Sequence, residues 1–304
     1  MKLSRADVIA YLGPEGTFTH QVANILFPHH HSMPFSNIPD TIQAITSNEE
    51  ISYAVVPIEN GIEGTVHVTM DWLIHHVHVP IQGEFIFPIH HALLVHPSYS
   101  NLPLTSFTKV LSHPQALAQC RHFIRDHLSH AEMVYTESTA HAAMQIGQQP
   151  EEAWLAIGTA DAARLNQLSV YKQGIEDYEN NHTRFMVIGD RPVNWHATNQ
   201  NEKLSMLLTL PADYPGALAL ILALFSRKNL NLCYIQSRPT KTGLGNYFFW
   251  IDCELPADAT DWIQVITEIK DLQCDVRILG AYPSRIYDQL MKSGDGHLIM
   301  KPIS

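Results

Sequence analysis

The chain has 304 residues, of which 45% are hydrophobic and 16% are charged, so it can bury a core and fold as two or three domains. Its formal net charge is −11 and it holds only 19 Lys and Arg, which argues against nucleic-acid binding, because phosphate recognition needs a dense basic surface. An anionic ligand is therefore expected to be held by a few local groups.

The cysteines and the first residues indicate where the protein works. The four cysteines show no Cys-x-x-Cys spacing, and each lies in an apolar segment where a small buried thiol is common. This pattern favours a reducing cytoplasm. The N-terminal segment is too short and too polar for a signal peptide or a membrane span, so we expect neither export nor a membrane partner.

The first two thirds of the chain alternate between short β-rich runs and helical patterns. Apolar residues between the runs recur at spacings of three and four, as over 66–77 and 117–128, which predicts helices packed on a sheet. The alternation predicts an α/β unit with a helix-covered, mainly parallel sheet. The predicted strands are 8–12, 53–57, 109–111, 133–135, 154–157 and 185–188.

Residues 84–95 form a long apolar run that contains His90 and His91, and we interpret it as one extended strand crossing between two lobes. Residues 190–203 lack periodic apolar positions and are predicted to be a linker. This gives a first, α/β unit over 1–190 and a linker over 191–203.

A second domain is predicted over 204–284, followed by a tail over 285–304. Its expected elements run strand, helix, strand, strand, helix, strand, which is the split α+β ferredoxin-like arrangement. Arg285 and Lys292 make the segment after Tyr282 polar, and we expect this tail to be partly disordered.

Two glycine-bearing turns, at 13–17 and 61–65, each lead from a strand into a predicted helix. Helix N-termini present unpaired N–H groups, so two such ends, including Gly16 and Thr17, are able to bind a dianion without many lysines. The alternative is that both are simple helix-entry turns. Neither has the spacing of a nucleotide-binding fingerprint.

Several polar residues follow predicted strands. Asn60 and Glu59 stand where a strand ends, the position from which α/β sheets project ligand groups, although Asn60 is equally suited to capping the next turn. Gln115 lies in the first turn of a helix that follows a strand. Ser138 and Thr139 repeat that arrangement, and capping is the favoured role for Ser138.

Residues 180–185 read Asn-Asn-His-Thr-Arg-Phe and place a hydroxyl beside a fixed cation at a strand entrance. A threonine hydroxyl is a poor acid, so Thr183 can act as a donor only where its surroundings stabilise the product. Arg184 is suited to hold a carboxylate or the loop itself.

The nineteen histidines do not predict a metal site. Adjacent residues such as His29, His30 and His31, which we place in a loop after Pro28, cannot face one ion together, and no His-Glu-x-x-His motif is present.

Five motifs occur in an order that resembles the prephenate dehydratase family, and they cover nearly the whole first unit. They are Gly13-Pro14-Glu15-Gly16-Thr17-Phe18, Val56-Pro57-Ile58-Glu59-Asn60, His113-Pro114-Gln115-Ala116, Ser138-Thr139-Ala140 and Thr183-Arg184-Phe185. The resemblance implies a two-lobed catalytic domain similar to a type II periplasmic binding protein, with the active site between its lobes. It also implies an ACT regulatory domain after it.

The reaction implied is loss of carbon dioxide and water from prephenate to give phenylpyruvate, without metal or organic cofactor. In the family the threonine of Thr-Arg-Phe donates to the departing hydroxyl, which corresponds to Thr183. Asn60 and Gln115 match positions that orient the substrate. The resemblance places further substrate-binding groups at Glu59, Ser138, Thr139, Arg184, Gly16 and Thr17.

The resemblance extends to a phenylalanine effector site shared between subunits of a homodimer or homotetramer. Its residues correspond to Gly216, Ala217, Leu218, Gln236, Ser237, Arg238 and Pro239. Two positions depart from the family pattern, since Gly61 replaces a serine and Gln236 replaces a glutamate. The motifs begin almost at Met1, so we expect a monofunctional enzyme without a preceding mutase domain.

Two alternatives stay open. Arogenate dehydratase performs the same elimination on the amino-acid analogue, and the motifs do not separate an amine from a ketone. A non-catalytic amino-acid sensor is the other alternative, and the retained Thr183 counts against it.

Overall fold

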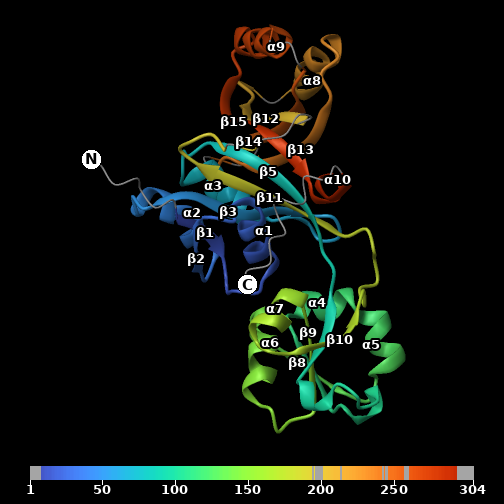
Figure 1. Ribbon diagram of the computed structural model, residues 1–304. Helices are drawn as coiled ribbons and strands as arrows, with labels where there is room; N and C mark the ends of the chain where they lie inside the picture. Colours follow the sequence, from blue (N-terminus) through green and yellow to red (C-terminus); the bar gives the residue numbers. More distant parts are fainter. Residues whose placement is uncertain are drawn as a thin grey trace, which may run out of the picture.

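The protein is described by a computed structural model that covers residues 8–193, 195, 201–212, 214–241, 243, 246–256 and 260–292. Figure 1 shows three parts, two α/β lobes and a C-terminal domain, which lies on the side of the first lobe away from the second. The two-lobed α/β unit and the ferredoxin-like domain expected from the sequence are confirmed.

The first lobe is built on strands from both ends of the two-lobed unit. β1, β2 and β3 are parallel, whereas β11 runs antiparallel between β3 and β5. Its strands are β1 (Val8–Leu12), β2 (His31–Phe35), β3 (Ile51–Asn60), β4 (Gly64–Thr65), β5 (Ile81–Pro88) and β11 (His182–Gly189). Its helices are α1 (Phe18–Leu26), α2 (Ile38–Ser47) and α3 (His67–His75).

The second lobe is a five-stranded sheet with helices around it, and its strand order is β10-β6-β9-β7-β8. The strands are β6 (Ala92–Val95), β7 (Lys109–Ser112), β8 (Glu132–Tyr135), β9 (Trp154–Gly158) and β10 (Ser169–Gln173). The helices are α4 (Pro114–Gln119), α5 (Arg121–His127), α6 (Thr139–Gln148) and α7 (Ala160–Leu165), with short 3-10 turns η1 (Pro97–Tyr99) and η2 (Leu104–Ser106). The predicted stripe over 117–128 is buried in this lobe, although the helix is broken at Cys120.

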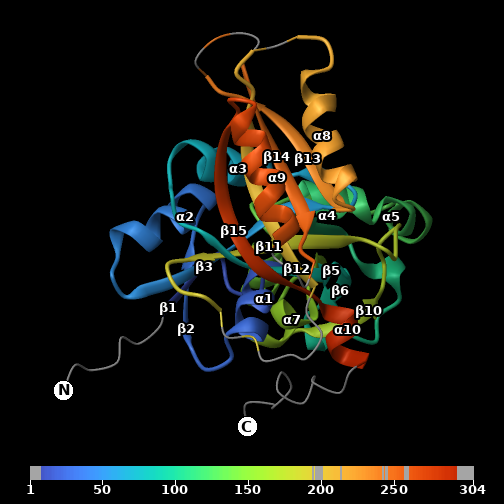
Figure 2. The ribbon, with the colours of Figure 1, turned by 90° about the horizontal axis from the view of Figure 1, so that it is seen from above.

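The C-terminal domain has the predicted order of elements. They are β12 (Asn201–Thr209), α8 (Ala217–Arg227), β13 (Leu232–Pro239), β14 (Tyr247–Glu254), α9 (Thr260–Asp271), β15 (Asp275–Ile286) and α10 (Tyr287–Lys292). Seen from above, α8 and α9 cover the outer face of its strands (Figure 2). The inner face packs on the first lobe, because Trp250 and Tyr282 share one apolar cluster with Met70 and Leu73 of α3.

One sheet runs through the first lobe and the C-terminal domain, in the order β13-β14-β12-β15-β5-β11-β3-β1-β2. The junction is the parallel pairing of Ser284, Arg285 and Ile286 with residues 84–86 of β5. The expectation of a partly disordered tail from residue 285 is therefore wrong up to Lys292, because Arg285 and Ile286 belong to β15 and the residues after them form α10. The remaining tail lies outside the described residues.

Other expectations also need correction. The sheets are mixed, because β6 and β11, the strands that follow the two crossings between the lobes, run antiparallel to their neighbours. The run over 84–95 is two strands, β5 and β6, which belong to different sheets and meet at the crossing between the lobes. β2 and β10 were not predicted, and His31 begins β2 instead of lying in a loop. The predicted linker ends before Lys203, which lies inside β12.

Two stretches, between β5 and β6 and between β10 and β11, carry the chain from one lobe to the other (Figure 1). They touch each other, because the carbonyl of His91 accepts from the N–H groups of Gly174 and Ile175, at 3.1 and 3.3 Å. Glu176 joins the same pair, accepting from the His91 N–H at 2.9 Å and contacting Nδ1 of His90 at 2.7 Å. These contacts join the two crossing segments to each other.

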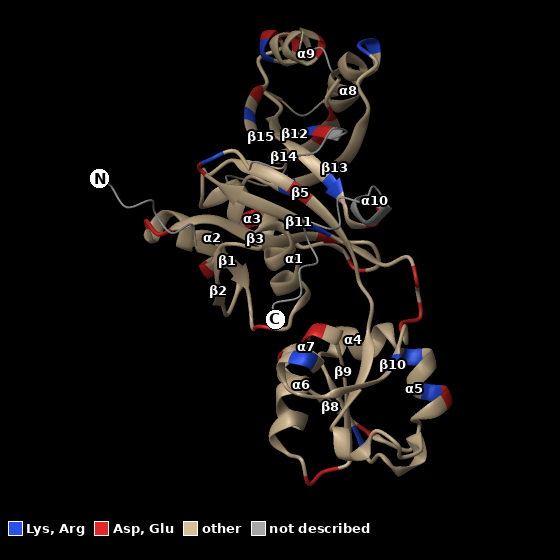
Figure 3. Ribbon diagram, in the orientation of Figure 1, with Lys and Arg blue, Asp and Glu red and all other residues tan. Residues whose placement is uncertain are grey.

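Lys, Arg, Asp and Glu residues are scattered along the ribbon of all three parts (Figure 3). No helix in the part of the chain that the structure describes is both long and apolar enough to cross a membrane.

Candidate active site

The polar segment before β11 meets the end of β3. Thr183 lies opposite Asn60 in the antiparallel pairing of these strands, and Nδ2 of Asn60 donates to the Thr183 hydroxyl at 2.8 Å. The two side chains are 6% and 8% exposed. The structure thus brings together two residues that stand 123 positions apart and that the sequence singled out.

The orientation of the Asn60 amide is fixed by its other contacts. Its Oδ1 accepts from the backbone N–H groups of Ile62 at 3.0 Å and Glu63 at 3.1 Å. Nδ2 must therefore carry the hydrogens that reach Thr183 and Oδ1 of Asn181, the latter at 3.0 Å. The capping interpretation of Asn60 is confirmed, because one end of its amide caps the turn, and the other end donates to Thr183. Since Thr183 accepts this bond, its own hydroxyl hydrogen is left for another acceptor.

A chain of buried polar groups continues from Asn60 into the second lobe. Nδ2 of Asn181 lies 3.4 Å from Oε1 of Gln119, which also receives Nε2 of His91 at 2.9 Å. Asn181, Gln119 and His91 are 1%, 7% and 3% exposed. Gln119 comes from α4, so the chain ties Thr183 to both lobes.

His91 is held as a neutral ring. Because Gln119 Oε1 is an acceptor, Nε2 of His91 carries the hydrogen and Nδ1 is left as a buried atom without a partner. Burial lowers the pKa of His91 below its usual value, and the bond to Gln119 opposes this only in part.

The sequence missed Gln119 and predicted Gln115 instead. The Gln115 side chain is exposed, and no hydrogen bond joins it to Thr183 or Asn60 in the described structure. The two glutamines are four residues apart on one helix and share a face, so the helical period was the signal that would have found Gln119. Asn181 carried a similar signal, because it lies in the polar segment that ends at Thr183.

Gly16 forms a contact between the lobes. The Thr159 hydroxyl, at the start of α7, donates to the carbonyl of Gly16 at 2.8 Å. Gly16 has φ of +88°, and a Cβ there would lie 3.1 Å from Ala162, so a larger residue would separate the lobes. Thr17 accepts from the N–H of His20, which makes this turn a helix entry as well.

Ser138 caps α6, as favoured from the sequence, by accepting from the N–H of His141 at 3.0 Å. Thr139 is the first residue of that helix. Neither is hydrogen-bonded to the group around Thr183 within the described ranges.

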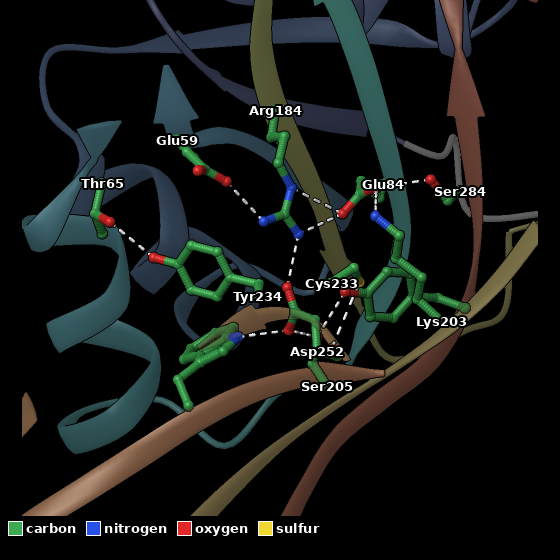
Figure 4. A network of polar contacts seen from close by, with 12 residues as sticks. Glu59, Thr65, Glu84, Arg184, Lys203, Ser205, Cys233, Tyr234, Asp252 and Ser284 are labelled. Atoms are coloured by element: carbon green, nitrogen blue, oxygen red, sulfur yellow. Dashed lines mark hydrogen bonds and ion pairs between the residues drawn. The ribbon is translucent and has the colours of Figure 1, made fainter. Parts of the chain in front are cut away.

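Glu59 and Arg184 lie on the other face of the sheet from Thr183, because consecutive strand residues alternate between faces. Figure 4 shows the Arg184 guanidinium among three carboxylates. It donates to Glu59 at 2.8 Å, to Glu84 of β5 at 3.0 Å and to Asp252 of β14 at 2.7 Å. The structure therefore does not bring Arg184 and Glu59 together with Thr183, and Arg184 holds carboxylates of the protein.

Glu84 and Arg184 keep their charges in this buried position. Burial alone would raise the pKa of Glu84, but Arg184 and Lys203 hold it below its usual value. Burial alone would lower the pKa of Arg184, but Glu84 and Asp252 raise it well above its ordinary value.

The predicted effector residues occupy one end of the C-terminal domain. Gly216 precedes α8 with φ of +93°, and Ala217 is buried while Leu218 is half-buried. The other four lie at the end of β13, where Nε2 of Gln236 donates to the carbonyl of Ser237 at 3.3 Å. They are Gln236, Ser237, Arg238 and Pro239. Arg238 already has a partner, because its Nη2 donates to both carboxylate oxygens of Asp71 in α3, at 2.6 and 2.7 Å.

Among the described residues, no group of three or more His, Cys, Asp or Glu side chains could hold a metal ion. The four cysteines are free, and three of them are buried.

A family model, curated relatives and solved structures are similar to this chain. The family model described as prephenate dehydratase matches residues 9–193. The prephenate dehydratase of Bacillus subtilis (strain 168) is 40% identical over 282 residues, which cover 91% of this chain and 98% of the relative. Among solved structures, a prephenate dehydratase of Arthrobacter aurescens in complex with L-Phe has a TM-score of 0.78 at 29% identity and covers 96% of this chain and 98% of its own. That of Staphylococcus aureus subsp. aureus Mu50 has a TM-score of 0.76 at 30% identity, with coverages of 91% and 99%.

Proposed function

The chain belongs to the prephenate dehydratase family, and from this premise we propose that Thr183 is the hydrogen donor in the conversion of prephenate to phenylpyruvate. The single observation that carries the proposal is the bond from Asn60 to Thr183. It fixes the hydroxyl as an acceptor from the protein and leaves its hydrogen for the substrate.

The reaction needs little from the enzyme apart from position and one donor. The bond from the ring to the carboxylate carbon breaks, its electron pair enters the ring, and the ring hydroxyl leaves with its own bonding pair. Carbon dioxide, water and an aromatic ring result, and the leaving oxygen needs one proton. A hydroxyl fixed beside that oxygen supplies a hydrogen bond where negative charge develops.

The second donor of the Asn60 amide goes to Asn181, so the Thr183 oxygen is held by one N–H that cannot rotate away. As Thr183 gives up its hydrogen, that N–H stabilises the charge left on its oxygen. Every partner in the chain from Asn60 to Gln119 is neutral, which suits a site that must admit a dicarboxylate. We assign to Gln119 the orienting role that the sequence suggested for Gln115.

We further propose that the turn with Gly16 and Thr17, together with the first turns at Gln115 and at Ser138 and Thr139, borders the substrate cleft. These residues precede or begin helices, whose N-terminal N–H groups suit carboxylate binding. Arg184 and Glu59 are reassigned from substrate binding to the junction with the C-terminal domain.

Phenylalanine is the proposed effector, and the C-terminal domain is the proposed ACT domain. The order of its elements supports this, and so does the relative from Arthrobacter aurescens that was solved with L-Phe. The effector residues are those at 216–218 and 236–239, with the difference that Arg238 is held by Asp71.

We propose that the protein works as a homodimer or homotetramer. β13 is an edge strand of the long sheet, and large apolar side chains on this domain are exposed, including Leu220 at 46% and Ile263 at 50%. Unpaired strand edges and apolar surfaces of this kind support self-association. The free cysteines support a reducing cytoplasm as its location.

The assay that tests the proposal is phenylpyruvate formation from prephenate, with arogenate in parallel and each reaction repeated with phenylalanine. Turnover of prephenate that phenylalanine suppresses is the expected result. Turnover without suppression would overturn only the effector site. A preference for arogenate would keep the chemistry and change the substrate. No turnover of either substrate, with phenylalanine still bound, would indicate a sensor.

A further inference from the structure

Thr183 and Arg184 are neighbours in β11, and they pair with Asn60 and Glu59, which are neighbours in β3. The register of the two strands shifts next to this pair, because β3 carries one extra residue there, Ile58. A bulge of this kind re-aims the side chains beside it, and Glu59, which follows Ile58, is bound by Arg184. What holds Arg184 therefore also holds the two strands beside the bond from Asn60 to Thr183.

Asp252 of the C-terminal domain is one of the groups that hold Arg184. Its side chain is fully buried, and its Oδ1 accepts from the Ser205 hydroxyl at 2.6 Å and from Nε1 of Trp250 at 2.7 Å. Its Oδ2 meets Nη2 of Arg184 at 2.7 Å (Figure 4). The carboxylate is thus fixed inside its own domain and offers one oxygen across the junction.

A second link runs through Glu84, which binds Arg184 and also receives Lys203 of β12 and Ser284 of β15, both at 2.6 Å. The Arg184 guanidinium further lies 5.2 Å from the ring centre of Tyr234, whose hydroxyl meets that of Thr65 at 2.7 Å. All four strands of the C-terminal domain thus contribute to the surroundings of one residue of β11.

We propose that Asp252 is a positioning residue for the dehydration step, which acts through Arg184 on the aim of Thr183. This inference rests on the proposed role of Thr183 as hydrogen donor. It makes the C-terminal domain part of the catalytic geometry even without an effector.

The substitution Asp252→Asn isolates this contact. The two donors at Oδ1, from Ser205 and Trp250, require the asparagine to keep its oxygen there, so its NH2 group must face Nη2 of Arg184. Two donors would then oppose each other at the junction while the volume stays the same. Glu268→Gln is the matched control, since Glu268 is an exposed carboxylate of the same domain that pairs with Arg227 at 2.8 Å.

The experiment measures kcat and KM for prephenate in the full-length Asp252→Asn protein, with circular dichroism and thermal unfolding to verify its fold. We expect kcat to fall by about 10-fold with a smaller change in KM, because a displaced donor affects the chemical step more than binding. Glu268→Gln should stay within about 2-fold of wild type.

A double-mutant cycle with Thr183→Ala separates positioning from a general loss of structure. If Asp252 acts through Thr183, Asp252→Asn lowers the residual kcat of Thr183→Ala by less than about 2-fold. An equal fractional loss in both backgrounds, or an unchanged kcat in the folded single variant, would overturn the inference. If Asp252→Asn does not fold, Ser205→Ala removes one hydrogen bond that holds the Asp252 carboxylate, which is a milder change. The same double-mutant cycle with Ser205→Ala then tests the positioning role.

The proposed function can fail separately. Full activity in Thr183→Ala would remove the donor assignment whatever Asp252 does. A dead Thr183→Ala beside a fully active Asp252→Asn would remove only the positioning role.

Discussion

The two faces of β11 at its first residues carry different kinds of polar chemistry. On the Thr183 face, a hydroxyl, two asparagines, a glutamine and a neutral histidine form one buried chain. On the Arg184 face, Arg184 and Lys203 bind Glu84, and Arg184 also binds Glu59 and Asp252. The Thr183 face is directed toward the second lobe, and the Arg184 face is directed toward the C-terminal domain.

The difference shows how one strand serves two purposes. A dicarboxylate substrate would be repelled by Glu59, Glu84 and Asp252, and the position of these groups on the opposite side of the sheet leaves the Thr183 face neutral. The charged face in turn gives directional, buried contacts that fix the strand between two domains. Because successive side chains of a strand point to opposite faces of the sheet, the neighbouring residues Thr183 and Arg184 can fill these two roles.

The largest expected effect comes from Arg184→Leu, which breaks the charged face. It would leave Glu84 and Asp252 buried without their shared cation, a change that costs about 3–5 kcal/mol of unfolding free energy. Urea unfolding measures the loss. Arg227→Leu removes an exposed cation of the C-terminal domain and should cost less than about 1 kcal/mol. Equal losses in the two variants would contradict the distinction.

The next effect comes from Asn60→Asp, which breaks the neutral face with almost no change in shape. The carboxylate still accepts from the N–H groups of Ile62 and Glu63, but it cannot donate a hydrogen bond to Thr183. It would instead accept a hydrogen bond from the Thr183 hydroxyl, whose hydrogen would then not be available to the substrate. We expect kcat for prephenate to fall by about 10²-fold. Folded protein with wild-type kcat would show that the donor at Thr183 is dispensable.

A smaller effect is expected from Gln119→Leu, and Gln115→Leu on the same helix is its comparison. Loss of Gln119 leaves Asn181 and His91 without a partner, and we expect kcat to fall by about 10-fold with a stability loss of about 1–3 kcal/mol. Steady-state kinetics and unfolding of the two variants distinguish them. A larger loss of kcat in Gln115→Leu would restore the assignment made from the sequence.

The smallest effect concerns pH. The pKa of His91 is lowered by burial, so below about pH 6.5 the unfolded chain binds a proton that the folded chain does not. The free energy of unfolding should therefore fall as pH drops, by at most about 1.4 kcal/mol per pH unit for this group. His91→Asn should show a shallower slope between pH 7.5 and 5.5 in urea unfolding. If the unfolding free energies of wild type and His91→Asn changed with pH at the same slope, other groups would cause the pH dependence. Candidates are His20 and His75, whose pKa values burial also lowers.

The parts of the fold that the sequence predicted are those with local signals. Strands such as 8–12 and 154–157 are continuous apolar runs, and the elements of the C-terminal domain alternate clearly. β2 and β10 were missed because they are short, polar edge strands, and β2 contains a proline. The continuous sheet between β5 and β15 depends on a pairing across 200 residues, for which the sequence gives no local signal.

The candidate site divides in the same way. Asn60 and Thr183 stand at the ends of apolar strands, where sheets place functional groups, and both were predicted. The partners of Arg184 could not be predicted, because they come from distant strands. Asp252 did carry one signal, since a carboxylate inside the apolar run of β14 requires a buried partner, although the sequence does not show which one.

The most direct test of the account is the kcat for prephenate of Thr183→Ala beside Thr183→Ser, in protein whose unfolding matches wild type. The account predicts that alanine lowers kcat by about 10³-fold, while binding of prephenate stays close to wild type and serine retains much of the rate. Wild-type turnover by Thr183→Ala would contradict it, because the hydroxyl that Asn60 holds would then have no part in the reaction.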